Sequence, residues 1–449
     1  MVSILGANSA SGGYEVSNSL RFNDGDSPYL RKSFGSGGDR RTFTWSGWVK
    51  PSKLGSIQVL FSSNSEGQIR FQGDGSIMIL HTGESQLITN ALFRDPAAWY
   101  HIVVAFDSGQ GTSSNRVKLY VNGVQITSFT TTQYPDQNTD FPFNANENHD
   151  LGKRASATSF YYGGYMTEVH FIDGSAKAPT DFGEFDDNGV WIPKEYDGSY
   201  GTTGFYLEFK QTGTSQNSSG IGADTSGNDN HFAVTNLAAT DITEDTCTNN
   251  FATMNPLDNY YAGATFSEGN CKIVTGSSPT TFVTSTLGVE TGKWYWEVKI
   301  IDKAGGSDDT SIGVQEGVSP GATDQMGYNT AGVQLRSNGN KHTNGSNATY
   351  MASQDNNDII MVAFDKTNNN VYFGANGQWG DGSGNTDESN PTSAISITVS
   401  DFVFAALGDM DGSDTCTYEI NFGNPSFAIS SGNTDGKYGN FEYAPPSGY

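Results

Sequence analysis

The chain has 449 residues, which is too long for one β-sandwich and suits two sandwiches with a connecting segment. It carries 24 Lys and Arg against 49 Asp and Glu, a formal charge of −25, which nucleic-acid backbones and anionic membrane surfaces repel. We therefore expect neither a nucleic-acid partner nor insertion into a membrane. Two explanations of the negative charge remain open: solubility in a salty medium, and carboxylate-rich loops that bind Ca²⁺.

Short aromatic and β-branched runs are separated by clusters of Gly, Asn and Asp. With 55 Gly and no long stretch of helix-forming residues, this pattern predicts an all-β fold of strands and tight turns. The three cysteines, Cys247, Cys271 and Cys416, lack the number and spacing of a disulfide framework or a zinc site. The first residues have neither the basic region nor the apolar core of a signal peptide, so we expect synthesis in a reducing cytosol without export by the general route.

A first module is predicted over residues 14–175, after an N-terminal segment of residues 1–13. Its predicted strands lie at residues 19–22, 43–49, 57–62, 68–71, 77–80, 99–106, 117–121 and 165–172. Residues 99–106 are apolar on nearly both faces, which suits an inner strand covered by a second sheet. Asn122-Gly123 lies between two alternating runs and predicts a tight hairpin, because both residues adopt positive φ readily.

Residues 176–275 are less regular and are predicted to form an ordered connector that packs on both neighbouring modules. A second module is predicted over residues 276–430, followed by a C-terminal tail of residues 431–449. In this module, an apolar strand at 358–365 precedes Asn376-Gly377. This is the order of features seen in the first module, so the two modules are expected to have related folds.

The predicted fold class is therefore all-β, with two tandem antiparallel β-sandwiches. The first module resembles the laminin-G-like, concanavalin-A-like jelly-roll family in its segments 19–22, 43–50, 99–107, 117–123 and 164–173. The second resembles the SPRY domain in its segments 292–297, 358–379 and 421–423. These resemblances imply a jelly roll followed by a SPRY-like sandwich.

Several longer segments, taken together, resemble virion proteins of tailed phages, marine ones in particular. They are SLRFNDGDSPYL, FTWSGWVK, IDGSAKAPTDFGEFDDNGVWIPKEY, GFYLEF, DTSGNDN and TNNFATMNPLDN. In such proteins these modules occur in fibres, appendages and capsid decorations. The resemblance implies a virion-surface protein that is assembled in the cytoplasm of a host bacterium and has other virion structural proteins as partners.

Concanavalin-A-like folds also include glucanases, which place two carboxylates about 5.5 Å apart on one strand face. Glu168 and Asp173 are five residues apart, so along a regular strand they face opposite sides. Glu184 and Asp187 lie in a Gly- and Pro-rich stretch. The six histidines lack the spacing of metal ligands. We therefore expect no enzymatic activity.

Two segments offer several side-chain oxygens of the kind that bind Ca²⁺. The stronger candidate set is Asp224, Asn228, Asp229 and Asn230. The weaker one is Asp409, Asp411 and Asp414. The first set does not have the spacing of an EF-hand, and the alternative is a network of Asx turns in which these side chains bind their own backbone.

Aromatic rings in loops beside Asp and Asn suit sugar binding, since rings stack on sugars and the oxygens bind hydroxyl groups. The ligand-binding candidates are Tyr161, Tyr162, Trp379 and Asp381. The alternative for the three rings is burial against the core of their own module.

The sequence thus predicts a phage fibre or appendage subunit that acts as an adhesin for a host-surface polysaccharide. The alternative is a structural decoration protein that binds capsid or tail proteins, and a glycan hydrolase is the least supported. A homotrimer is compatible with a fibre, although the sequence contains no coiled-coil or collagen-like segment.

Overall fold

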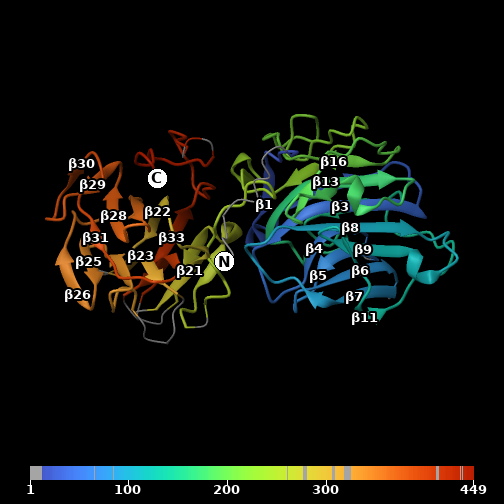
Figure 1. The fold of residues 1–449 in the computed structure, drawn as a ribbon. Coiled ribbons are helices and arrows are strands. Elements are labelled where there is room, and N and C mark those ends of the chain that lie inside the picture. Colours follow the sequence, from blue (N-terminus) through green and yellow to red (C-terminus); the bar gives the residue numbers. More distant parts are fainter. Residues whose placement is uncertain are drawn as a thin grey trace. The chain divides into compact units, whose positions relative to one another are not determined.

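The computed structural model describes residues 13–64, 66–83, 85–259, 261–276, 281–305, 309–317, 325–410, 414–434, 436 and 438–449. They form two compact units, with the division between Asn250 and Phe251 (Figure 1). Both units are built from antiparallel sheets, so the predicted all-β class and the two tandem sandwiches are confirmed. Among the described residues, no helix has the length and apolar character needed to cross a membrane.

Short strands dominate the N-terminal unit. They are β1 (Ser19–Phe22), β2 (Tyr29–Ser33), β3 (Thr42–Pro51), β4 (Gln58–Ser63), β5 (Gly67–Phe71), β6 (Ser76–Thr82), β7 (Ser85–Leu92), β8 (Tyr100–Asp107), β9 (Val117–Val121), β10 (Val124–Ile126), β11 (Phe129–Thr132), β12 (Asn148–Leu151), β13 (Gly164–Asp173), β14 (Gly183–Phe185), β15 (Trp191–Pro193), β16 (Phe205–Leu207), β17 (Ala233–Thr235) and β18 (Ile242–Thr243). Single 3-10 turns lie between some of them: η1 (Asp24–Asp26), η2 (Ser113–Asn115), η3 (Pro179–Asp181) and η4 (Ala239–Asp241).

Two eight-stranded sheets make the sandwich of this unit. Sheet A has the order β10-β9-β8-β3-β13-β1-β18, with β16 paired to β13. Sheet B has the order β11-β7-β6-β5-β4-β12-β2-β17. Their inner faces enclose a core rich in aromatic rings, in which Trp45 of sheet A stacks on Phe61 of sheet B with centroids 6.3 Å apart. The period-two alternation of each strand places its apolar residues in this core.

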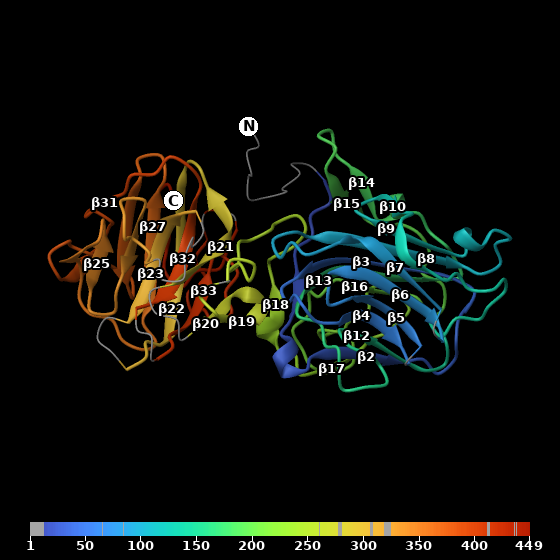
Figure 2. The same cartoon turned by 90° about the horizontal axis from the view of Figure 1, so that it is seen from below.

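Sheet A is covered on its outer face as well. Val103, on β8, packs there against Phe182 and Tyr196. The hairpin of β14 and β15 lies beside the turn between β9 and β10 (Figure 2), and Gly123 is needed at this contact because a Cβ would overlap with the ring of Trp191. The segment that follows β13 thus explains why β8 is apolar on both faces.

The structure differs from the predicted connector at residues 176–275. Strands β16, β17 and β18 pair with β13, β2 and β1, and Phe205 and Phe232 belong to the core of the N-terminal unit. Residues 176–250 therefore complete the first sandwich, and residues 251–275 belong to the second unit. Strands of two or three residues are too short to show an alternating pattern, which is why the sequence suggested an irregular segment.

The C-terminal unit forms a second sandwich. Its elements are β19 (Thr265–Ser267), η5 (Glu268–Asn270), β20 (Lys272–Val274), β21 (Phe282–Val289), β22 (Lys293–Asp302), β23 (Thr310–Glu316), β24 (Gly332–Leu335), β25 (Asn340–Thr343), β26 (Ser346–Thr349), β27 (Ile359–Asp365), β28 (Asn370–Ala375), β29 (Gln378–Gly380), β30 (Thr386–Glu388), β31 (Ile395–Ser396), β32 (Val403–Asp409) and β33 (Thr417–Asn421). A nine-stranded sheet runs β19-β20-β33-β22-β27-β28-β29-β30, with β31 paired to β28, and a six-stranded sheet runs β21-β32-β23-β24-β25-β26.

The C-terminal tail packs on the outer face of the nine-stranded sheet. The carboxylate of Glu297, which is fully buried, accepts the backbone N–H groups of Glu442 at 3.0 Å and Tyr443 at 2.7 Å. The ring of Phe441 lies edge-on to Tyr295, with centroids 5.1 Å apart. These contacts tie the tail to strand β22.

Candidate functional site

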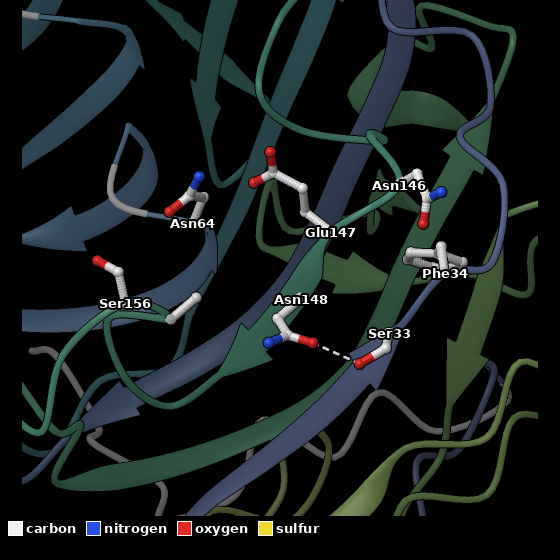
Figure 3. Close-up of a pocket in the computed structure, with 8 residues that line it drawn as sticks. Ser33, Phe34, Asn64, Asn146, Glu147, Asn148 and Ser156 are labelled. Atoms are coloured by element: carbon white, nitrogen blue, oxygen red, sulfur yellow. Dashed lines mark hydrogen bonds between the residues drawn. The ribbon is translucent and has the colours of Figure 1, made fainter.

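An open pocket of about 400 Å³ lies where strands β2, β12 and β4 of sheet B are neighbours. Its lining residues come from the ends of these strands and the loops beside them: Ser33, Phe34, Asn64, Asn146, Glu147, Asn148, Ala155 and Ser156. In Figure 3, Asn64 and Ser156 lie on one side, Phe34 and Asn146 on the other, and Glu147 and Asn148 between them. Because most of these side chains are polar and exposed, this pocket is the candidate functional site.

Three of the lining residues form a row across neighbouring strands. Ser33 and Asn148 are directly opposite in the antiparallel register of β2 and β12, and the backbone N–H of Asn64 donates to the carbonyl of Asn148 at 3.3 Å. The hydroxyl of Ser33 donates to Oδ1 of Asn148, so the amide nitrogen of Asn148 can donate to a ligand. Side chains opposite one another on a sheet face are about 5 Å apart, so the row offers polar groups at regular intervals.

His149 positions the segment that carries Asn146 and Glu147. Its buried ring lies edge-on to Phe34, with centroids 5.0 Å apart. Nε2 accepts the backbone N–H of Asn144 at 3.0 Å, so the ring proton is on Nδ1, which donates to the carbonyl of Glu147 at 3.1 Å. Burial lowers the pKa of His149 to about 4, so the ring is neutral at pH 7 and keeps both hydrogen bonds.

Asn144 fixes the start of the same segment. Its side chain is fully buried, and Nδ2 donates to Oδ1 of Asp173 at 2.6 Å and to the carbonyl of Asp39 at 2.9 Å. Its Oδ1 accepts the hydroxyl of Thr203. Gly38 is needed at this crossing, because a Cβ there would overlap with the side chains of Thr203, Asp173 and Asn144. The wall of the pocket is therefore rigidly attached to the sandwich.

An ion pair between half-buried Arg31 and buried Asp150 stabilises the opposite rim. Nε and Nη2 of Arg31 each donate to a carboxylate oxygen of Asp150 at 2.7 Å, and Asp150 is fully buried. Nη2 of Arg31 also donates to the carbonyl of Ala155 at 3.1 Å. The hydroxyl of Ser62 donates to the carbonyl of Lys153 at 2.8 Å and accepts the N–H of Ala155 at 2.9 Å. These bonds fix Ala155 and the adjoining Ser156 over strand β4.

The chemistry of the lining suits ligands rich in hydroxyl groups. Glu147 contributes acceptors, and the amides of Asn146 and Asn148 and the hydroxyl of Ser156 contribute donors and acceptors. Glu147 is the one carboxylate among the eight lining residues, so the pocket does not contain the carboxylate pair that glycoside hydrolysis requires. Phe34 is 5% exposed, so its ring supports the wall and does not offer a stacking surface.

Two of the predicted ligand-binding residues are core residues, which corrects their assignment. Tyr162 is 0% exposed, lies edge-on to Phe22 and donates its hydroxyl to the carbonyl of Tyr165 at 3.2 Å. Trp379 is 4% exposed and packs with Tyr295 and other residues beneath the C-terminal tail. Ring burial, the alternative left open by the sequence, therefore describes both residues.

The other two candidates remain at the surface but outside the pocket. Tyr161 is half-buried, with Nζ of Lys153 at 6.0 Å from its ring centroid. Asp381 accepts the backbone N–H groups of Ser383 at 2.7 Å and Asn385 at 3.0 Å, and the side-chain amide of Asn385 at 2.7 Å. These hydrogen bonds lower the pKa of Asp381 to about 2 and give the side chain a structural role in its own turn.

The predicted Ca²⁺ loop forms a network of Asx-type hydrogen bonds. Oδ1 of Asp224 accepts the N–H groups of Tyr206 and Ser226 at 2.8 and 2.9 Å, and Oδ2 accepts that of Asn230 at 2.8 Å. The side-chain amides of Asn228 and Asn230 both donate to the carbonyl of Gly204, at 3.0 and 2.9 Å. The described residues contain no group of three His, Cys, Asp or Glu side chains arranged for a metal ion.

The remaining members of these sets do not converge on one site. Asp229 is exposed, and its carboxylate lies 3.6 Å from Nε2 of His231. In the weaker set, Asp409 is buried and accepts the hydroxyl of Thr275 at 2.6 Å, whereas Asp411 lies outside the described residues. The loop geometry thus fits the Asx-turn alternative, with the oxygens of Asp224 used by the backbone.

Neither carboxylate of the nearest glucanase-like pair is open to a substrate. Glu168 is 5% exposed and accepts the hydroxyl of Tyr206 at 2.7 Å. Asp173 accepts the N–H of Asp39 at 2.7 Å and the amide of Asn144 at 2.6 Å. Both carboxylates are used to hold the covering segment of the N-terminal unit in place.

The pocket residues were absent from the sequence prediction. The available signal was the run Asn144-Ala145-Asn146-Glu147-Asn148, which places four polar side chains between strands in a sandwich. Asn64 gave a second signal, because Asn shortly after a predicted strand is typical of a turn. In the structure it adopts a positive φ of 51°. Nothing in the sequence indicates that these two segments are neighbours.

One family model matches the N-terminal unit. Residues 24–180, which include every pocket residue, match the Laminin_G_3 family model, described as the concanavalin A-like lectin/glucanases superfamily. No curated protein matches the chain. The chain is similar to the SPRY domain of human HERC1, with 17% identity over 33% of this chain and 86% of that one and a TM-score of 0.27.

Two further solved structures are similar to the chain. One is a candidate carbohydrate-binding protein from Bacteroides ovatus, with 14% identity over 49% of this chain and 58% of that one and a TM-score of 0.36. The other is a heptameric SAP-like pentraxin from Limulus polyphemus, with 16% identity over 37% of this chain and 80% of that one and a TM-score of 0.28.

Proposed function

We propose that the N-terminal unit binds glycans through the pocket between strands β2, β12 and β4. The observation that carries this proposal is the row of Ser33, Asn64 and Asn148 beside Glu147, in an open pocket within the residues that match the lectin and glucanase family model. Hydroxyl, amide and carboxylate groups on a rigid sandwich are suited to hydrogen bonding with sugar hydroxyls.

The proposed setting is the surface of a tailed-phage particle, where the chain acts as a host-binding adhesin in a fibre or appendage. Support comes from the phage-like segments of the sequence, such as SLRFNDGDSPYL and DTSGNDN. An open polar pocket binds one sugar weakly, and several copies on one particle raise the overall avidity by about 10² to 10⁴. The glycan is released unchanged, because the proposed site contains a single carboxylate.

The test uses the full chain, multimerised on a carrier. It is assayed against purified envelope polysaccharides from a panel of bacteria, and against capsids and tails of phages that do not carry it. We expect binding to at least one polysaccharide, with the length of the polysaccharide unchanged after incubation. Shortening of the polysaccharide would instead indicate a hydrolase.

A second candidate is the decoration protein, which binds other virion proteins. It is favoured by exposed apolar side chains around Trp191: Phe185 is 54%, Val190 38% and Val124 58% exposed. Phe185 packs edge-on against Trp191, with centroids 4.9 Å apart. Exposed apolar clusters of this kind are typical of protein-binding surfaces. If the chain bound capsids or tails but no polysaccharide, that outcome would support the decoration protein and contradict the adhesin.

A further inference from the structure

Two arginines, Arg70 and Arg154, lie beside the pocket, one on strand β5 and the other in the loop after β12. Arg70 lies on β5 between Ile69 and Phe71, which both point into the core, so its side chain is on the outer face. Nε and Nη1 of Arg70 donate to the side-chain oxygens of Gln72 at 3.0 Å and Gln68 at 2.7 Å.

Arg154 belongs to the loop of residues 152–163, which follows β12. The loop passes over β4 at Ser62, whose hydroxyl accepts the N–H of Ala155 at 2.9 Å. It then runs along the edge of β4, where the N–H of Val59 donates to the carbonyl of Phe160 at 3.0 Å. The guanidinium of Arg70 lies 6.0 Å from the ring centroid of Phe160. Arg154 directly precedes Ala155, so it borders the rim of the pocket.

Neither arginine forms an ion pair with the part of the chain that the structure describes. Other arginines of this unit do have a carboxylate partner: Arg31 pairs with Asp150 and Arg41 with Asp140. Nε of Arg154 is buried without a hydrogen-bond partner among the described atoms. A buried donor without a partner costs stability unless a ligand satisfies it.

The electrostatic environment also disfavours the positive charge of Arg70. Burial lowers the pKa of Arg70, and the nearby charge of Arg154 lowers it further. An anion bound beside Arg70 would offset both effects. Arginine is suited to this role because its planar donors bind carboxylate, phosphate or sulfate oxygens in pairs.

We infer that Arg70 and Arg154 form a subsite for an anionic substituent of the bound glycan, a carboxylate, phosphate or sulfate group. The inference rests on the proposed glycan-binding function and narrows it to acidic polysaccharides. The charge of −25 on the whole chain does not prevent this contact, because the Debye length at physiological salt is about 8 Å and distant charges are screened.

The first experiment measures the melting temperature of the full chain in inorganic sulfate and in inorganic phosphate. The variants are Arg154→Gln and Arg70→Gln, and the matched control is Arg94→Gln, which removes the same charge from an exposed position on the same unit. Sulfate stabilises proteins in general because it is excluded from their surface. The anion-induced change in melting temperature is therefore compared between variants in the same buffer.

We expect the anions to raise the melting temperature of the wild type and of Arg94→Gln more than that of either subsite variant. Without added anion, Arg154→Gln should melt at the same temperature as the wild type or higher, since a repulsive charge has been removed. If both anions raised the melting temperature of all four proteins equally, the proposed subsite would be wrong.

The second experiment compares binding of the multimerised chain to dextran sulfate, polygalacturonate and neutral dextran. The first two distinguish sulfate from carboxylate. We expect at least one acidic polymer to bind more tightly than dextran, and Arg154→Gln to reduce that preference by on the order of tenfold. Arg94→Gln should retain it.

The outcomes separate this inference from the proposed function. Equal binding of neutral and acidic polymers, unaffected by Arg154→Gln, would overturn the subsite and leave glycan binding intact. An anion-dependent rise in melting temperature that requires Arg154, with no polysaccharide bound in any assay, would support the anion subsite and contradict its use for glycans.

Discussion

His149 is the residue on which the pocket wall depends most directly. Its neutral ring accepts a hydrogen bond from the backbone N–H of Asn144 and donates one to the carbonyl of Glu147. Protonation at Nε2 would break the hydrogen bond with Asn144. The folded pKa is about 4, below the ordinary value of about 6.5, because the ring is buried. The unfolded chain therefore takes up a proton first as the pH falls.

The free energy of unfolding should consequently decrease as the pH is lowered from about 6.5 to 4, with His149 contributing up to about 1.4 kcal/mol per pH unit. Above that window this contribution is fully present. Denaturant unfolding at several pH values, on the wild type and on His149→Gln, measures it. We expect a shallower pH dependence for His149→Gln, and superimposable pH profiles would contradict the role given to this ring.

Residue type alone does not indicate whether an aromatic side chain in a loop is exposed. Tyr161 and Tyr162 are adjacent in the sequence, yet Tyr161 is half-buried while Tyr162 is at the centre of the core. Trp379 is buried because the distant tail residue Phe441 packs in the same cluster. Such long-range contacts are not encoded in a local pattern, so the sequence could only leave burial open as an alternative.

Strand β12 is the element that brings the pocket together. It lies between β2 and β4 and is followed by the loop of residues 152–163. The sequence analysis did not predict this strand, because its four residues, Asn148 to Leu151, include only one aliphatic side chain. His149 takes the place of an apolar residue on the inner face, where it contacts Phe34 and Phe61.

The position of the loop after β12 depends on the carboxylate of Asp150, which holds Arg31 and, at 3.6 Å, Lys153. In Asp150→Asn, two buried or half-buried cations lose their common partner. We expect a loss of about 3 to 5 kcal/mol in the free energy of unfolding, together with weaker glycan binding.

The matched control for this substitution is Asp140→Asn, which breaks the ion pair with Arg41, where both side chains are 51% exposed. Exposed pairs contribute at most about 1 kcal/mol, so the control should unfold nearly as the wild type does. Denaturant unfolding compares the three proteins. If the free energy of unfolding decreased equally in both variants, burial of Asp150 would not determine the position of the loop.

At the scale of the whole molecule, length, composition and turn chemistry were sufficient to predict two antiparallel sandwiches. The boundary between them was predicted only to lie within residues 176–275, and the structure has it between Asn250 and Phe251. Its position was not more closely predictable, because residues 176–250 complete the first sandwich through the short strands β16, β17 and β18. Their pairing partners are between 34 and 224 positions away in the chain, for example Phe171 with Phe205 and Ser19 with Thr243. Pairing over such separations depends on the assembled fold and leaves no local sequence pattern.

The central claim, that the pocket of the N-terminal unit binds glycans, is tested most directly by titrating the full chain with a polysaccharide fragment that it binds. Asn148→Ala and Glu147→Gln alter the pocket, and Asn115→Ala alters an exposed residue of the same unit outside it. Melting curves establish that each variant is folded. The account predicts that both pocket variants lower the affinity by on the order of tenfold while Asn115→Ala binds as the wild type does. Wild-type affinity in all three folded variants would contradict the claim.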